Sequence, residues 1–212
     1  MLNLHSKGER ALKSNEQLLH ARTVLKKTTD NKLLSVFPEQ SKVRIFSLLT
    51  LVELRLGQVI YESGQTLEFV YFPTNCIISL LYVMENGSSA EISVVGNEGV
   101  VGIAVFMGGE STPNRAVVQS AGYAFRLKAS ALRKEFNNEA DIRLILLRYT
   151  QALMAQMSQT AVCNRHHTID QQLCRWLLLS LDRLPTNELA MTQELIANML
   201  GVRREGVTEA AG

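Results

Sequence analysis

The hydrophobic period of this chain changes once, near Lys128, and that change constrains the fold more than any other feature. Between residues 51 and 128, β-branched and aromatic runs alternate with glycine-containing turns, which is typical of short antiparallel strands. Asn86-Gly87 lies between two such runs and predicts a hairpin with a type I′ turn, because both central residues of that turn need a positive φ. After Lys128 the apolar residues recur at helical spacing. An α+β fold follows.

The first part of the chain is more polar. Residues 1–30 are predicted to be an N-terminal extension, either a frayed helix or a mobile arm. From Asn31, apolar spacing predicts short helices that pack on the strands.

A long helix is predicted from Asp141 to about Asn164, after a short one from Ala129 to Phe136. It has two apolar sides, and the side that does not cover the strands needs a partner, which an identical helix of a second subunit supplies most simply. Four residues recur at or beside coiled-coil spacing and are the predicted dimer contacts: Leu146, Thr150, Leu153 and Met157. The alternative is a helix buried wholly within its own subunit.

The C-terminal region carries the signals of a helix-turn-helix unit. Thr168 and Gln171 form a capping box that begins one helix, and Thr192 caps a second, QELIANML. Gly201 ends that helix in a tight turn, and a third helix begins near Arg203.

Residue spacing within this unit supports the same reading. Ala197, four residues before Gly201, lets two helices approach, and Val207, six residues after it, fills the small core between them. The exposed start of the third helix is where recognition helices touch bases. Seven residues are predicted to bind DNA: Thr192, Gln193, Arg203, Arg204, Glu205, Thr208 and Glu209.

Within this set, Arg204 is suited to guanine and Glu205 to cytosine N4, while Thr192 and Gln193 are suited to phosphates. The alternative is a plain two-helix connection with a solvated charged face. The net charge is only +2, so DNA binding must rest on a local surface.

Composition excludes several other classes. Apolar residues make up 46% and charged residues 20% of the chain, and no apolar run reaches the length of a membrane span or forms a secretory signal. We therefore expect a cytoplasmic protein without a membrane partner. Three cysteines without a CxxC pair predict reduced thiols, and the sequence holds no catalytic triad order, phosphate loop or HExxH motif, so no enzymatic activity is predicted.

Several segments together resemble the Crp/Fnr family of bacterial transcription regulators. They are LGQVIYESGQTLEFVYF (56–72), EGVVGIAVFMGG (98–109), NRAVVQ (114–119) and MTQELIANMLGVRREGVT (191–208). The resemblance implies a cupin-like β-roll or jelly roll that senses an effector, a long dimerisation helix and an all-α helix-turn-helix domain. The corresponding boundaries are 31–136, 137–165 and 166–212. Homodimers, double-stranded DNA, a small-molecule effector and RNA polymerase are the implied partners.

The effector site departs from the cyclic-nucleotide pattern of this family. Gly102-Ile103 stands where a Gly-Glu pair would bind the ribose, and Asn114-Arg115-Ala116 has an arginine without a following hydroxyl. Isoleucine cannot accept a hydrogen bond, so a buried ligand hydroxyl would lose roughly 1 to 3 kcal/mol. Cyclic AMP is therefore disfavoured, and the effector and any cofactor stay unidentified. Arg115 is expected either to bind another anion or to form a surface salt bridge.

An iron-sulfur cluster held by four cysteines of one chain is excluded, because the chain has three cysteines. Cys163 and His167 are four residues apart and are the one candidate pair for a metal, although packing of Cys163 and a hinge position for the histidines are favoured. In this family a wing follows the recognition helix, whereas the sequence ends at Gly212. We expect a truncated winged helix, and the alternative function is a ligand-sensing or interaction module that no longer binds DNA.

Overall fold

The computed structural model describes residues 30–85, 87–184, 188–189 and 191–210. The predicted N-terminal extension, apart from Asp30, lies outside the described residues. Two short helices open the described chain, α2 (Lys32–Ser35) and α3 (Glu39–Phe46). The buried side chain of Asn31 anchors them, because its Nδ2 donates to the carbonyls of Pro73 at 2.8 Å and Gly99 at 3.0 Å.

Seven strands follow, and all their pairings are antiparallel. Their bounds are β1 (Thr50–Leu54), β2 (Val59–Tyr61), β3 (Phe69–Pro73), β4 (Ile77–Val83), β5 (Ser89–Val95), β6 (Arg115–Ser120) and β7 (Gly122–Lys128). One sheet has the order β1-β7-β3 and the other β2-β6-β4-β5. Side chains of both sheets, such as Phe72, Phe125, Ile78 and Val118, share one core. The predicted β-unit is therefore a two-sheet roll.

The hairpin predicted at Asn86-Gly87 joins β4 and β5, but its turn differs from the prediction. Val83 pairs with Ser89, and the N–H of Met84 donates to the Ser88 carbonyl at 2.8 Å. Gly87, at φ 83°, closes the turn by donating to the Met84 carbonyl at 2.9 Å, so it is not a central residue of a two-residue type I′ turn. A three-residue connection needs a left-handed residue at its end, which glycine supplies.

Five helices follow the strands. They are α4 (Ala129–Asn138), α5 (Ala140–His166), α6 (Ile169–Leu181), α7 (Gln193–Leu200) and α8 (Arg204–Ala210), and a 3₁₀ turn, η1 (Ile103–Val105), precedes β6. The predicted capping box starts α6, with the N–H of Thr168 donating to Gln171 Oε1 at 3.1 Å. No helix in the described part of the chain is both long and apolar enough to cross a membrane.

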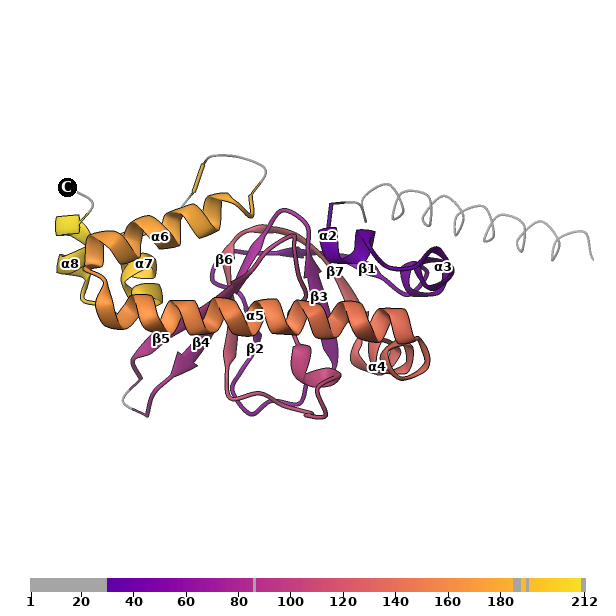
Figure 1. Cartoon of the computed structure of the whole chain (residues 1–212). Helices are drawn as coiled ribbons and strands as arrows, with labels where there is room; N and C mark the ends of the chain where they lie inside the picture. The colour runs from indigo at the N-terminus through magenta and orange to yellow at the C-terminus, as the bar shows by residue number, and fades with distance from the viewer. Residues whose placement is uncertain (1–29, 86, 185–187, 190, 211–212) are drawn as a thin grey trace, which may run out of the picture.

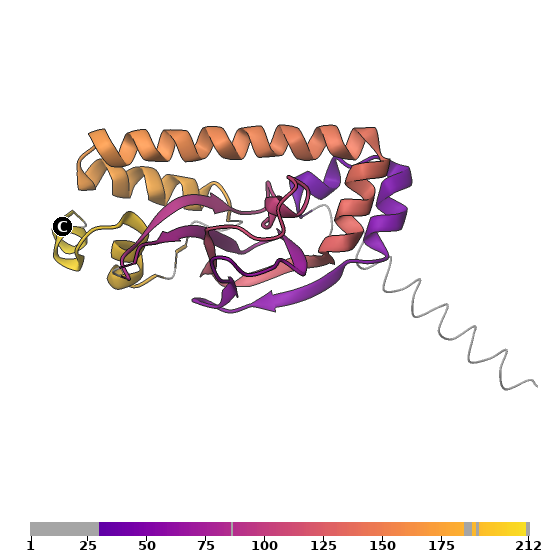
Figure 2. The same cartoon turned by 90° about the horizontal axis from the view of Figure 1, so that it is seen from below.

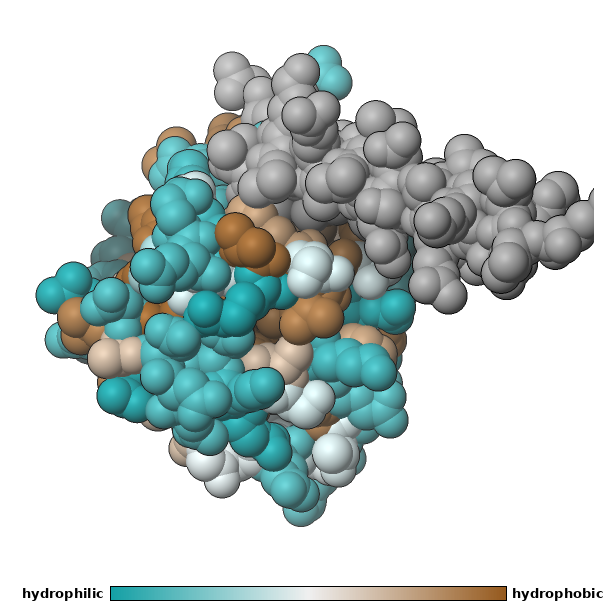
Figure 3. Space-filling view, turned by 90° about the vertical axis from the view of Figure 1, so that its right-hand side faces the viewer, coloured by the Kyte–Doolittle hydropathy of each residue, from teal (hydrophilic) through white to brown (hydrophobic). Residues whose placement is uncertain are grey.

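The long helix α5 runs along the whole β-roll and connects the two ends of the molecule (Figures 1 and 2). Helices α3 and α4 lie at one end, where Arg44 forms ion pairs with Glu135 at 2.9 Å and Glu139 at 2.6 Å. Figure 3 shows the described surface of that end as mostly hydrophilic with separate hydrophobic side chains. Helices α6, α7 and α8 gather at the other end beside β4 and β5 (Figure 2).

Candidate nucleic-acid interface and effector cavity

The turn between α7 and α8 is built as the sequence predicts. Thr192 caps α7 by accepting a hydrogen bond from the N–H of Leu195 at 3.1 Å. Gly201 ends α7 with φ 66°, a left-handed conformation that glycine adopts without steric cost. The N–H of Val202 then donates to the Ala197 carbonyl at 3.0 Å and satisfies one free carbonyl of the helix end.

A small apolar core holds the three C-terminal helices together. Ala197, Leu200 and Val207 are buried in it with Leu173 and Trp176 of α6. The predicted packing roles of Ala197 and Val207 are confirmed. The β-roll also contributes to this core through Leu81 and Val117, so the helices are docked on the sheet.

The seven predicted DNA-contacting residues all have exposed side chains on one connected unit. Arg203 lies in the turn before α8, and Arg204 and Glu205 are the first two residues of α8. The Thr208 hydroxyl lies 3.1 Å from Gln193 Oε1, which places the start of α7 beside α8. Neither Arg203 nor Arg204 forms an ion pair with another described residue, so both guanidinium groups face solvent.

Three of the predicted effector residues meet at one cavity between the β-roll and α5. Gly102, Ile103 and Asn114 line it, and its volume is about 20 Å³. The other lining residues come from the roll and from α5: Tyr61, Leu67, Leu80, Val100, Ala104, Thr112, Leu153 and Met157. Ligand pockets usually measure about 300 to 1,000 Å³, so this space holds roughly one water molecule.

The other two predicted effector residues do not reach the cavity. Arg115 Nε lies 3.1 Å from Glu62 Oε2, an ion pair whose N–H is not aligned for a hydrogen bond. Ala116 is fully buried in the core of the roll. Of the two roles expected for Arg115, the structure shows the salt bridge. Sequence reasoning missed Glu62, which follows β2, because the sequence does not show that β2 pairs with β6.

The predicted dimer contacts require a correction. Leu146, Thr150 and Leu153 are buried within the chain, and Leu146, Leu153 and Met157 pack against the β-roll core. The large apolar residues exposed on α5 are Leu144, Leu147, Met154 and Val162. The two apolar sides predicted for this helix are confirmed, but the sequence did not show which side faces the roll, because both have the same spacing.

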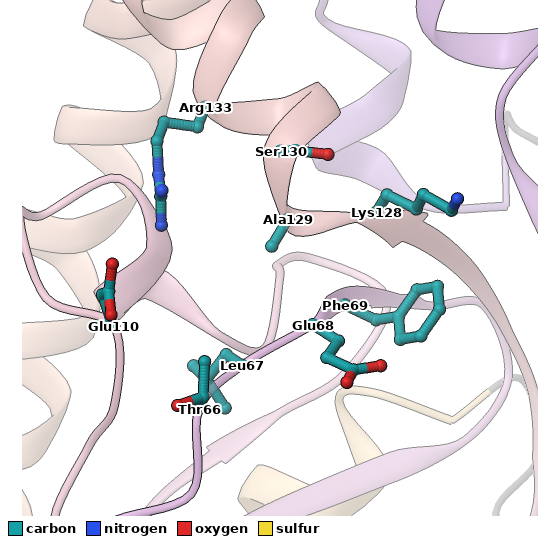
Figure 4. A pocket seen from close by; sticks show the side chains of 9 residues that line it. All are labelled: Thr66, Leu67, Glu68, Phe69, Glu110, Lys128, Ala129, Ser130 and Arg133. Atoms are coloured by element: carbon teal, nitrogen blue, oxygen red, sulfur yellow. The ribbon is translucent and has the colours of Figure 1, made fainter.

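A larger hollow lies elsewhere, at the start of α4. Its volume is about 340 Å³, and Figure 4 shows Arg133 extending toward Glu110 across it. Arg133 Nε donates to the Val105 carbonyl at 3.1 Å. The lining contains two basic residues, Lys128 and Arg133, and two acidic ones, Glu68 and Glu110, so it favours no single class of charged ligand.

The candidate metal pair is not assembled. Cys163 is buried and lies 3.2 Å from Gln159 Nε2, whereas His166 and His167 are exposed at the end of α5. Within the described residues there is no group of three or more potential metal ligands. All three cysteines are free thiols.

The fold and these surfaces define a DNA-binding protein in which a long helix joins a β-roll to a helix-turn-helix unit. Residues 51–139 match the model of the cyclic nucleotide-binding domain, and residues 171–212 match that of the Crp-like helix-turn-helix domain. The chain belongs to the Crp/Fnr family of transcription regulators, whose members are not enzymes. A comparison with curated protein sequences finds no match.

Solved structures show the same fold at low sequence identity. FixK2 from Bradyrhizobium japonicum is 19% identical with a TM-score of 0.66, and the match covers 77% of this chain and 82% of that one. A putative Crp/Fnr-family regulator from Eubacterium rectale is 15% identical with a TM-score of 0.69, covering 84% and 83%. The c-di-GMP-responsive global regulator CLP of Xanthomonas campestris is 11% identical with a TM-score of 0.64, covering 81% and 89%.

Proposed function

We propose that this regulator works as a homodimer that reads operator DNA through Arg203, Arg204 and Glu205. The observation that carries the proposal is the outward position of both arginines, without ion pairs among the described residues, on a helix held by the buried Val207. Because a guanidinium group donates two parallel hydrogen bonds to guanine, an uncommitted arginine at the start of a recognition helix is suited to base reading.

The remaining predicted contacts are suited to fixing the unit on the duplex. Thr192 and Gln193 begin α7, and Gln193 lies beside Thr208 of α8. Hydroxyl and amide groups of this kind bind phosphate oxygens and set the register of a helix in the groove. Glu209 is also exposed but carries a negative charge, so it favours contact with a base donor over contact with phosphate.

The homodimer is proposed on the exposed apolar face of α5. Leu144, Leu147 and Met154 are separated by three and seven residues, which is the spacing of a coiled-coil seam. A second copy of the same helix would bury all three. RNA polymerase remains a predicted partner on the strength of the family alone.

The effector is proposed to act through α5. Leu153 and Met157 line the small cavity together with Ile103, and α5 leads directly into α6. A ligand that enlarges this cavity must therefore displace side chains of the helix that joins the two domains. Cyclic AMP is a poor candidate, because the cavity measures only about 20 Å³ and the Ile103 side chain offers no acceptor for a ribose hydroxyl.

The test is selection of operator duplexes from a random pool, followed by gel-shift titration of Arg204→Ala. Loss of a base contact is expected to weaken binding by about 1 to 3 kcal/mol and to relax specificity at one position. Arg55→Ala is the matched control, because Arg55 is also exposed but follows β1 of the β-roll and lies outside the helix-turn-helix unit. Equal affinities of all three proteins, or no enrichment of any duplex, would overturn the proposal.

A further inference from the structure

A chain of four buried polar side chains crosses the contact between the β-roll and α6. Ser79 of β4 lies 2.7 Å from Glu91 of β5 and 2.6 Å from Gln119 of β6, and Gln119 Nε2 donates to Ser180 of α6 at 2.8 Å. Ser79, Gln119 and Ser180 are fully buried, and Glu91 is 6% exposed. Buried polar groups are costly unless each has a partner, so this cluster needs a physical account.

With the Gln119 amide oriented as it is here, counting protons favours a neutral carboxylic acid at Glu91. The Ser180 hydroxyl donates to the Trp176 carbonyl at 2.9 Å, so its oxygen accepts from Gln119 Nε2 and the Gln119 oxygen points at Ser79. Ser79 has one proton for two neighbouring oxygens, those of Gln119 and Glu91. Both contacts are satisfied only if the Glu91 carboxyl brings a proton of its own.

The surroundings of Glu91 favour the same state. Burial raises the pKa of Glu91 to about 7, against the lowering effects of Ser79, Trp176, Arg183 and Arg175. The Trp176 indole Nε1 faces the carboxyl but does not reach hydrogen-bond geometry. Arg183 forms an ion pair with Glu98 at 2.7 Å. The negative charge of Glu98 weakens the electrostatic effect of Arg183 on the Glu91 carboxyl.

Apolar packing and the ion pair between Arg183 and Glu98 also hold this contact surface. Leu81 and Val117 of the roll are buried against the C-terminal helices. Gly96 passes so close to Arg183 that a Cβ there would lie 2.6 Å from Arg183 Cβ. If α6 moved away, Glu91, Ser79 and Gln119 would meet water, whereas the strands that carry them would keep their own pairings.

We propose that Glu91, Ser79, Gln119 and Ser180 form a latch that docks the helix-turn-helix unit on the β-roll, and that the latch closes when Glu91 is protonated. The docked state binds the proton more tightly than the released state, in which Glu91 titrates as an ordinary exposed carboxyl. Docking is therefore strongest below the released pKa and weakens as pH rises through about 7. Between pH 6 and pH 8 the docking equilibrium constant is expected to fall about tenfold.

The experiment measures how often the surface under α6 opens. Val117→Cys places a thiol on β6 beneath the docked helices, in a Cys174→Ser background that removes the exposed native cysteine. Alkylation of residue 117 is followed by peptide mass spectrometry at pH 6 and pH 8. Glu91→Gln retains a donor toward Ser79 but does not titrate, so it mimics the closed latch at both pH values.

Dividing the rate of the protein with Glu91 by that of the Glu91→Gln variant cancels the pH dependence of the thiol. This ratio is expected to rise about tenfold from pH 6 to pH 8. Glu85→Gln, the same change at an exposed position of the same hairpin, should leave the rise intact. A constant ratio, or an equal effect of Glu85→Gln, would overturn the latch.

A second variant keeps the test decisive if Glu91→Gln does not fold. Ser180→Ala removes the only α6 hydroxyl of the latch and should raise alkylation of residue 117 at pH 6, with circular dichroism confirming the fold. Unchanged labelling would contradict the proposal. The experiment contains no DNA, so its result is independent of the proposed operator contacts.

Discussion

Gly201 serves two purposes at the residue scale. It ends α7 in a left-handed conformation, and a Cβ there would lie 3.3 Å from Ala90 Cβ on β5. The first purpose was predicted from the spacing of Ala197, Gly201 and Val207. The second was not, because the sequence does not show which strand lies beneath the turn.

Gly201→Ala is expected to lower the free energy of unfolding by about 1 to 2 kcal/mol, since a side chain in the left-handed region is strained. Urea unfolding followed by fluorescence of Trp176, the single tryptophan, measures this change. Gly57→Ala is the control, because Gly57 has a similar φ of 75° but open space around it. A smaller loss for Gly201 than for Gly57 would argue against the close contact with β5.

Glu91 is the residue whose importance sequence reasoning missed. In SAEISVV its position follows the alternation of a strand, and a glutamate there reads as a solvent-facing residue. The structure buries it because α5 packs on the same face of β5, where Ser93 bonds to Gln156, and Trp176 of α6 faces the Glu91 carboxyl. The sequence shows only a single acidic residue between apolar ones. Whether that residue is buried depends on which element packs on its face of the strand.

At the scale of elements, α5 shows why periodicity alone could not assign its two faces. Leu146 and Leu147 are neighbours in sequence, yet Leu146 is fully buried against the roll and Leu147 is exposed. Both belong to apolar rows of helical spacing. The assignment depends on how α4 directs α5 across the roll, which is a long-range property.

The double variant Leu147→Glu, Met154→Glu is expected to convert the proposed dimer into monomers, because it places like charges across a seam that should be apolar. Native mass spectrometry reports the subunit number. Ala152→Glu, an exposed position about 140° around the helix from Leu147 and about 160° from Met154, should leave the dimer intact. A dimer that survives the double variant would place the interface on another surface.

At the scale of the whole molecule, α5 connects the small cavity in the β-roll to the helix-turn-helix unit that docks on the roll. The small cavity proposed to respond to the effector meets α5 at Leu153 and Met157, and the helix-turn-helix unit follows the end of α5 at His166. Apolar side chains, including that of Ile103, leave this cavity too small for a ligand. A small cavity and a docked C-terminal unit together describe one conformation of the regulator.

A large excess of cyclic AMP, on the order of 1 mM, is expected to leave the thermal unfolding midpoint unchanged, because a ligand that cannot enter the native cavity cannot stabilise it. A ligand at one hundred times its Kd would add about 2.7 kcal/mol of stability, which differential scanning fluorimetry detects easily. Adenosine monophosphate controls for general nucleotide effects. A midpoint that rises with cyclic AMP alone would show that the cavity opens.

The sequence by itself determined the features that depend on neighbouring residues. These are the strand-to-helix change at Lys128, the capping box at Thr168, the turn at Gly201 and the burial of Val207, each of which follows from local backbone chemistry or spacing. Only the tertiary structure decided which side of α5 meets the roll, that Arg115 pairs with Glu62, and that Glu91 is buried beneath α5 and α6. Those outcomes depend on contacts between residues far apart in the chain, and a pattern within one segment carries no information about what covers it.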